Sequence, residues 1–106
     1  MNKNLKFNHR IILQKEEQQK GDFGETKHSF VNLIEVWGNI TPINVSQNFS
    51  KMKNENEITH HIDIRYFKDA IECKRIMFGN RIFTVVGVVN QNETNEFITF
   101  KVKEIV

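Results

Sequence analysis

Apolar and polar residues alternate between Glu57 and Phe67, and this period of two predicts a β-strand. One face of the strand would carry Ile58, His60, Ile62, Ile64 and Tyr66, and the other Thr59, His61, Asp63, Arg65 and Phe67. A second signal follows at residues 75–83, where two short apolar runs flank Gly79 and Asn80. Glycine followed by asparagine fits a two-residue type II′ or I′ turn, so this segment is predicted to be a β-hairpin.

Two strands are predicted nearer the start of the chain. The apolar run at residues 11–13 predicts a first strand between His9 and Lys15. A second strand is predicted over residues 29–41, ending at Pro42, and one of its faces would carry Ile34, Val36, Gly38 and Ile40. A glycine inside such a run predicts a bulge or the close approach of another backbone.

The end of the chain predicts two more strands. Residues 82–89 are almost wholly apolar, which predicts a strand buried on both faces. After a polar turn at residues 90–96, a last strand alternates Ile98, Phe100 and Val102 with polar residues. The predicted fold is therefore mainly β: a small antiparallel β-barrel formed by a single domain over residues 1–106.

Three segments depart from this strand pattern. Residues 1–8 are expected to be a disordered end, and residues 15–28 and 43–57 are expected to be long loops. The run 15–20 mixes lysine, glutamate and glutamine, which is typical of a solvated loop or a hairpin end, and glycines at 21 and 24 predict a turn. Val45, Phe49 and Met52 have helical spacing, which predicts a short helix or, equally, a loop insertion around residues 45–54.

Charge and composition exclude several classes of protein. Fifteen basic and thirteen acidic residues give a net charge of +2, and they are interleaved rather than gathered into the basic face of a DNA-coating domain. No run approaches the length of about 18 apolar residues that a membrane span needs, and no signal peptide is expected at the N-terminus. A single cysteine, Cys73, fits an intracellular origin.

Few residues indicate catalytic or metal chemistry. His60 and His61 would point to opposite faces of their strand, which argues against a shared metal ion. Asp63 and Arg65 share a face and are expected to form a local ion pair. Cys73 has no recognisable histidine partner and is expected to be a buried thiol. We therefore expect no catalytic residue, no cofactor and no metal, and the protein is not expected to be an enzyme.

Aromatic and basic residues are interleaved around the predicted hairpin, at Arg75, Phe78, Arg81 and Phe83. Such a pattern is compatible with the stacking of single-stranded bases on a barrel, so a small nucleic-acid-binding β-barrel module is the alternative function. The favoured interpretation is that the two phenylalanines belong to the barrel core and that the arginines are solvated.

The order of motifs along the chain resembles the small head–tail joining proteins (head-closure or adaptor proteins) of tailed bacteriophages. The matching segments are His9-Arg10-Ile11-Ile12-Leu13-Gln14, Asp22-Phe23-Gly24, Val36-Trp37-Gly38-Asn39-Ile40-Thr41-Pro42, Thr59-His60-His61-Ile62-Asp63-Ile64-Arg65-Tyr66, Arg75-Ile76-Met77-Phe78-Gly79-Asn80-Arg81-Ile82-Phe83 and Asn90. The resemblance extends from about His9 to Glu104. The residues of these motifs that would form the scaffold are Trp37, Pro42, Thr59, His60, Arg65, Tyr66, Gly79 and Arg81. Phe30 replaces a usual tryptophan, and Gly38 replaces a usual alanine.

The resemblance implies a structural component of the virion, made in the bacterial cytoplasm. Such proteins form a ring at the head–tail interface, between a portal or connector adaptor protein and a tail terminator or tail tube protein. DNA would pass through the ring without being read by sequence, and the chain can be a monomer before assembly. The two long loops would then supply contacts along the ring axis, with Asp22, Phe23, Lys51 and Lys53 as candidate contact residues.

Overall fold

The computed structural model describes residues 7–43 and 58–105, which form six strands and two short 3-10 helices. The strands are β1 (His9–Lys20), β2 (Thr26–Pro42), β3 (His60–Arg65), β4 (Arg75–Phe78), β5 (Arg81–Asn90) and β6 (Phe97–Ile105), and the 3-10 helices are η2 (Lys68–Glu72) and η3 (Gln91–Glu93). All neighbouring strands are antiparallel, and the order β1-β2-β3-β6-β5-β4 closes into a barrel because β4 also pairs with β1. The predicted mainly-β antiparallel barrel is confirmed.

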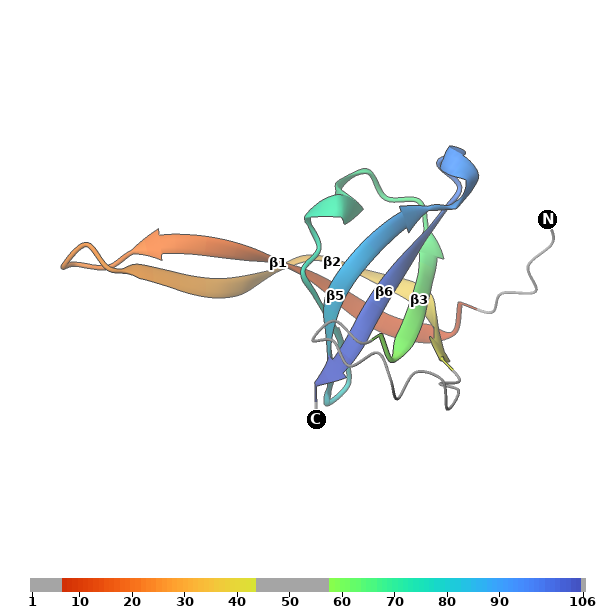
Figure 1. Ribbon diagram of the computed structural model, residues 1–106, viewed down its shortest axis with the longest axis horizontal. Coiled ribbons are helices and arrows are strands. Elements are labelled where there is room, and N and C mark those ends of the chain that lie inside the picture. Colours follow the sequence, from red (N-terminus) through yellow and green to blue (C-terminus); the bar gives the residue numbers. More distant parts are fainter. Residues whose placement is uncertain (1–6, 44–57, 106) are drawn as a thin grey trace, which may run out of the picture.

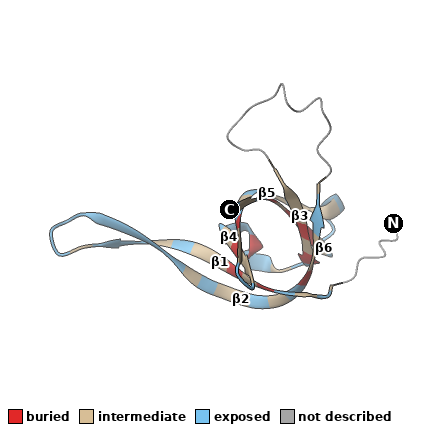
Figure 2. Ribbon diagram, turned by 90° about the horizontal axis from the view of Figure 1, so that it is seen from below, coloured by how far each residue is buried: buried red, intermediate tan, exposed pale blue. Residues whose placement is uncertain are grey.

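The buried residues of the strands line the inside of the barrel, where Figure 2 colours them red. The buried core consists of Ile11, Leu13, Ile62, Ile64, Ala70, Cys73, Ile76, Phe83, Ile98, Phe100 and Val102. This set confirms the inward faces predicted for β3 and for β6. A six-stranded barrel packed in this way has a hydrophobic core at its centre and no open pore.

The first two strands are much longer than the barrel that they help to form. They pair continuously from His9 opposite Gly38 to Lys20 opposite Thr26, with one irregularity next to Leu13. Pairing of β1 with β4 ends at Gln14, so residues 14–20 and 26–32 leave the barrel as a two-stranded ribbon, here called the arm (Figure 1). Seven residues at about 3.3 Å each give the arm a length of roughly 23 Å. The long loop predicted over residues 15–28 is therefore wrong, because only the turn between Lys20 and Thr26 is not strand.

Glycine positions explain two further features of the fold. A Cβ atom on Gly38 would lie 3.0 Å from the Asp63 carbonyl oxygen and 3.0 Å from Ile11 Cδ1, which confirms the predicted close approach. Gly79 has a φ of +59° while Asn80 stays at negative φ, so the Phe78–Arg81 hairpin has the φ signs of a type II′ turn.

Strand β5 differs from its prediction, because only one of its faces is buried. Phe83 points into the core, whereas Thr84, Val86 and Val89 are exposed on the outside of the barrel. A register shift between Val85 and Gly87 also interrupts the alternation. An apolar run was expected to be covered on both sides, but within the described chain nothing covers its outer face.

Two of the three segments predicted to be irregular, residues 1–8 and 43–57, lie mostly outside the described residues. The proposed helix or loop around 45–54, with Lys51 and Lys53, belongs to this part, as do residues 1–6 of the predicted disordered end. The described Phe7 differs from that prediction, since its ring stacks on Phe97 with 5.9 Å between centroids.

Candidate functional site

The tip of the arm is an ordered turn that presents one large apolar side chain to solvent. The Gly21 N–H donates to the Glu25 carbonyl at 2.6 Å, and the Glu25 carboxylate folds back to accept from the Phe23 N–H at 3.2 Å. Gly24 takes a φ of +84°, which a residue with a side chain rarely adopts. The Phe23 side chain is consequently 94% exposed, with Asp22 exposed beside it.

The base of the arm is fixed to strand β4 by one arginine. Arg75 Nε donates to Gln14 Oε1 at 2.8 Å, and Gln14 Nε2 donates in turn to Asn32 Oδ1 at 2.8 Å. The guanidinium carbon of Arg75 lies 3.8 Å from the centre of the Phe30 ring, a cation–π contact. Further out, His28 Nδ1 is 2.9 Å from a Glu16 carboxylate oxygen.

The rest of the arm is solvated on both faces (Figure 2). Within the described chain, the outer edges of residues 15–20 and 26–37 pair with no third strand. A two-stranded ribbon without a hydrophobic face is marginally stable in water, because its hydrogen bonds replace equally good bonds to water. Beyond its base, the arm therefore receives little stabilisation from contacts within the described chain.

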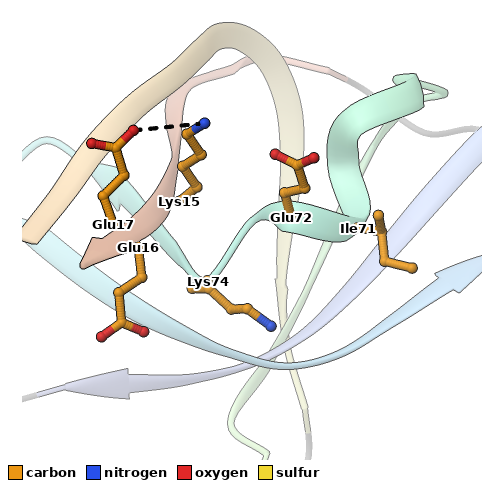
Figure 3. Close-up of a pocket in the computed structure, with 6 residues that line it drawn as sticks. All are labelled: Lys15, Glu16, Glu17, Ile71, Glu72 and Lys74. Atoms are coloured by element: carbon orange, nitrogen blue, oxygen red, sulfur yellow. Dashed lines mark ion pairs between the residues drawn. The ribbon is translucent and has the colours of Figure 1, made fainter. Parts of the chain in front are cut away.

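An open groove of about 430 Å³ lies beside the base of the arm, between β1 and η2 (Figure 3). Its lining residues are Lys15, Glu16, Glu17, Ile71, Glu72 and Lys74. Lys15 pairs with Glu17 at 3.8 Å, whereas Ile71 is an apolar side chain that is 72% exposed. The groove thus combines an apolar wall with charged rims.

A polar cluster closes one end of the barrel and joins three motif residues. Arg81 donates to both carboxylate oxygens of Glu104, at 2.8 and 3.1 Å, and its Nη2 lies 3.3 Å from His60 Nε2. The Thr59 hydroxyl accepts from the Glu104 N–H at 2.8 Å and lies 2.8 Å from His60 Nδ1. The sequence interpretation found Thr59, His60 and Arg81 but missed Glu104, whose partner lies 23 residues away.

Protonation in this cluster follows from its contacts. An arginine nitrogen can only donate, so the contact with Arg81 favours a neutral His60 imidazole in which Nε2 accepts and Nδ1 carries the proton. Burial lowers the pKa of His60, the charge of Arg81 lowers it further, and Glu104 opposes both effects. The hydrogen bond from Arg81 lowers the pKa of Glu104, and the same bond raises the pKa of Arg81.

The remaining motif residues lie on the outside of the barrel or next to the ends of strands. Trp37 lies on the outside of the barrel, 52% exposed, with Arg10 at 5.2 Å from its ring centre. Arg65 lies over Phe97 and does not pair with Asp63; the predicted ion pair is wrong, because Asp63 accepts from the Thr99 hydroxyl instead. Pro42 ends β2, Tyr66 directly follows β3, and Gly79 lies in the turn between β4 and β5.

The histidine and cysteine residues that could carry chemistry lie in separate surroundings. His60 and His61 occupy opposite faces of β3, as predicted, since His60 packs on the core residue Phe83 while His61 pairs with Lys101 on the outside. Among the described residues, no group of three or more His, Cys, Asp or Glu could hold a metal ion. Burial raises the pKa of Cys73 to about 11, so its thiolate is scarce at neutral pH. None of the helices described has the length and apolar content to cross a membrane.

The aromatic–basic pattern that raised the nucleic-acid alternative has a structural explanation. Phe83 is buried in the core and Phe78 packs against it, as favoured. Arg81 is neutralised by Glu104, and Arg75 covers the ring of Phe30. The aromatic and basic residues of this pattern are therefore accounted for by core packing and by contacts within the described chain.

Two solved structures are similar in fold to this chain. The chain is similar in fold to protein SF1141 from Shigella flexneri 2a, known from a solution structure, with a TM-score of 0.68 and 19% identity over 98% of this chain and 96% of that one. A chain of the virion of a native gene transfer agent particle has a TM-score of 0.67 and 19% identity, over 99% of both chains. No curated protein sequence matches.

The family comparison covers nearly the whole chain. A family described as phage head completion protein matches residues 3–105, which include the barrel, the arm and the polar cluster. This match confirms the resemblance to head-closure proteins that was carried by the order of the motifs. The chain therefore belongs to the phage head completion protein family and is a structural component of a virion.

Proposed function

We propose that several copies of this chain form a ring at the head–tail interface, where the ring joins the head to the tail around the DNA channel. Family membership supports a role in completing the head. The arm is the main structural support for assembly, because it holds the exposed Phe23 about 23 Å away from the barrel, where another chain can contact it.

The filled interior of the barrel decides where DNA would pass. Side chains such as Phe83, Phe100 and Ile62 are completely buried at its centre, so a single copy has no lumen for a duplex. A channel then requires several copies around a common axis, and cyclic symmetry is the ordinary way in which identical chains enclose one. DNA would pass as a charged polymer without sequence readout.

The neighbours of the ring follow from its position. A portal or connector adaptor protein would lie on the head side, and a tail terminator or tail tube protein on the tail side. Asp22 and Phe23 at the tip of the arm are proposed assembly contacts. Lys51 and Lys53 keep the same proposed role, although they lie outside the described residues.

Purified protein and DNA-filled heads that lack it provide the test. We expect the protein to co-sediment with the heads, and the complexes to show an added ring at the portal vertex by electron microscopy and to accept tails. The variant Phe23→Ser should fold normally and restore tail attachment poorly. Correctly folded wild-type protein that binds neither filled heads nor portal rings would refute the proposed function.

A further inference from the structure

The tip of the arm and the groove at its base have complementary properties. We propose that, in the ring, Phe23 of one copy inserts beside Ile71 in the groove of the neighbouring copy. This inference rests on the proposed ring, and it names the surface that receives the arm. For the tip it replaces the axial contact expected from the sequence by a lateral contact between identical chains.

The apolar partners are the first argument. Phe23 and Ile71 are the two most exposed large hydrophobic side chains among the described residues, at 94% and 72%. Scattered exposed apolar residues are ordinary, but these two stand at a projecting tip and on the wall of an open groove. An aromatic side chain entering an apolar-walled groove is the usual form of an interface anchor.

The geometry makes the contact intermolecular. The groove lies at the base of the arm, where Lys15 lines it, and five strand residues at about 3.4 Å each separate Lys15 from Lys20 by roughly 17 Å. The paired strands hold the tip away from η2, as Figure 1 shows. A copy therefore cannot fill its own groove without breaking its own ribbon.

Charge gives an independent argument for a second copy as the occupant. Around the tip, the exposed charged residues that form no ion pair within the described chain are Lys20, Asp22, Glu25 and Lys27, of which Glu25 accepts a hydrogen bond from the Phe23 N–H. In the groove, Glu72 and Lys74 likewise form none there, whereas Glu16 pairs with His28 and Glu17 with Lys15. Insertion of the tip would bring the acidic Asp22 to Lys74 and a basic strand residue to Glu72, so each unpaired charge in the groove has an opposite at the tip.

The two surfaces are different, so the contact is head-to-tail and repeats from copy to copy. Such heterologous contacts close into a ring when the rotation between copies allows it. One inserted phenylalanine buries about 150–250 Å², well below the roughly 1,200 Å² of a stable interface. The contact should thus be weak between two free chains and persist only when a portal ring gathers many copies.

Cysteine cross-linking tests the pairing directly. All variants would carry Cys73→Ala, because that buried thiol lies two residues from position 71. In Phe23→Cys/Ile71→Cys protein assembled on portal rings and oxidised with copper phenanthroline, we expect a ladder of covalent oligomers. The matched control Phe23→Cys/Glu93→Cys, with the second cysteine on the exposed turn after β5, should give none.

Charge reversal sharpens the test and removes the effect of a folding defect. In the cross-linking background, Asp22→Lys should reduce the ladder several-fold, and adding Lys74→Asp should restore it. Rings that form without a ladder would overturn this inference and leave the proposed ring standing. A covalent link from residue 23 to a portal or tail protein would also overturn it. Absence of any ring would refute the proposed function and this inference together.

Discussion

The same substitution at two phenylalanines should have opposite consequences, because one ring is in the core and the other is in solvent. Phe83 is completely buried, and its ring meets His60 edge-on with 5.3 Å between centroids. Replacing a buried phenylalanine by alanine costs about 3–5 kcal/mol through lost burial and the cavity that remains. Domains of this size are stable by about 5–15 kcal/mol, so Phe83→Ala should remove roughly a fifth or more of the total.

Phe23→Ala is the matched control for this substitution. Its side chain is 94% exposed at the tip of the arm, so the free energy of unfolding of the monomer should change by no more than about 0.5 kcal/mol. Assembly on portal rings should respond in the opposite order, with Phe23→Ala impaired.

Urea unfolding followed by tryptophan fluorescence measures both variants. Because only the folded state is altered, the slope m should stay constant while the midpoint of Phe83→Ala falls. Thermal unfolding should show a decrease in Tm of about 12 °C or more for Phe83→Ala and almost none for Phe23→Ala. A decrease in the free energy of unfolding of more than about 1 kcal/mol for Phe23→Ala would refute this prediction, and so would a decrease of less than about 1 kcal/mol for Phe83→Ala.

Three further outcomes follow from the described contacts. Burial holds the pKa of His60 below its ordinary 6.5, so on acidification the unfolded chain binds this proton before the folded chain does. The free energy of unfolding should therefore fall as pH drops from 6.5 towards the lowered pKa. In urea titrations at several pH values, His60→Gln should flatten that pH dependence. Cys73, with a pKa of about 11 and a buried thiol, should resist a thiol reagent at pH 8 until urea unfolds the protein; rapid labelling of the native protein would contradict this. Gly79→Ala should cost about 1–2 kcal/mol because of the positive φ, whereas Gly87→Ala, with only Lys101 side-chain atoms at 3.9 Å, should be nearly neutral in the same measurement.

Sequence reasoning succeeded where one face of a strand is buried and the other is wet. In β3 and β6 the burial of Ile62 and Phe100 imposes a period of two, and that period is visible in the sequence. The arm has no buried face, so its strands leave no such period and residues 15–28 had the composition of a loop. The glycines at 21 and 24, which predict a turn, were the available signal for a hairpin.

The candidate assembly residues were only partly accessible from sequence. Asp22 and Phe23 were found through the resemblance, and their exposure agrees with a contact role. Ile71 and Lys74 could not be found, because a groove depends on how η2 packs against β1, and these two elements are far apart in sequence. Glu104 was missed for a similar reason, since only barrel closure brings it to Arg81.

The polarity of the arm has a consequence for the life of the free chain. The open strand edges of its outer part, at residues 15–20 and 26–29, would be templates for uncontrolled strand addition if they were apolar. Lysines at positions 15, 20 and 27 and glutamates at 16 and 17 oppose such aggregation, because adding a strand would bury or crowd their charges. These charges should therefore keep free copies of the chain from joining through their strand edges. The composition that concealed the arm in the sequence also protects its edges.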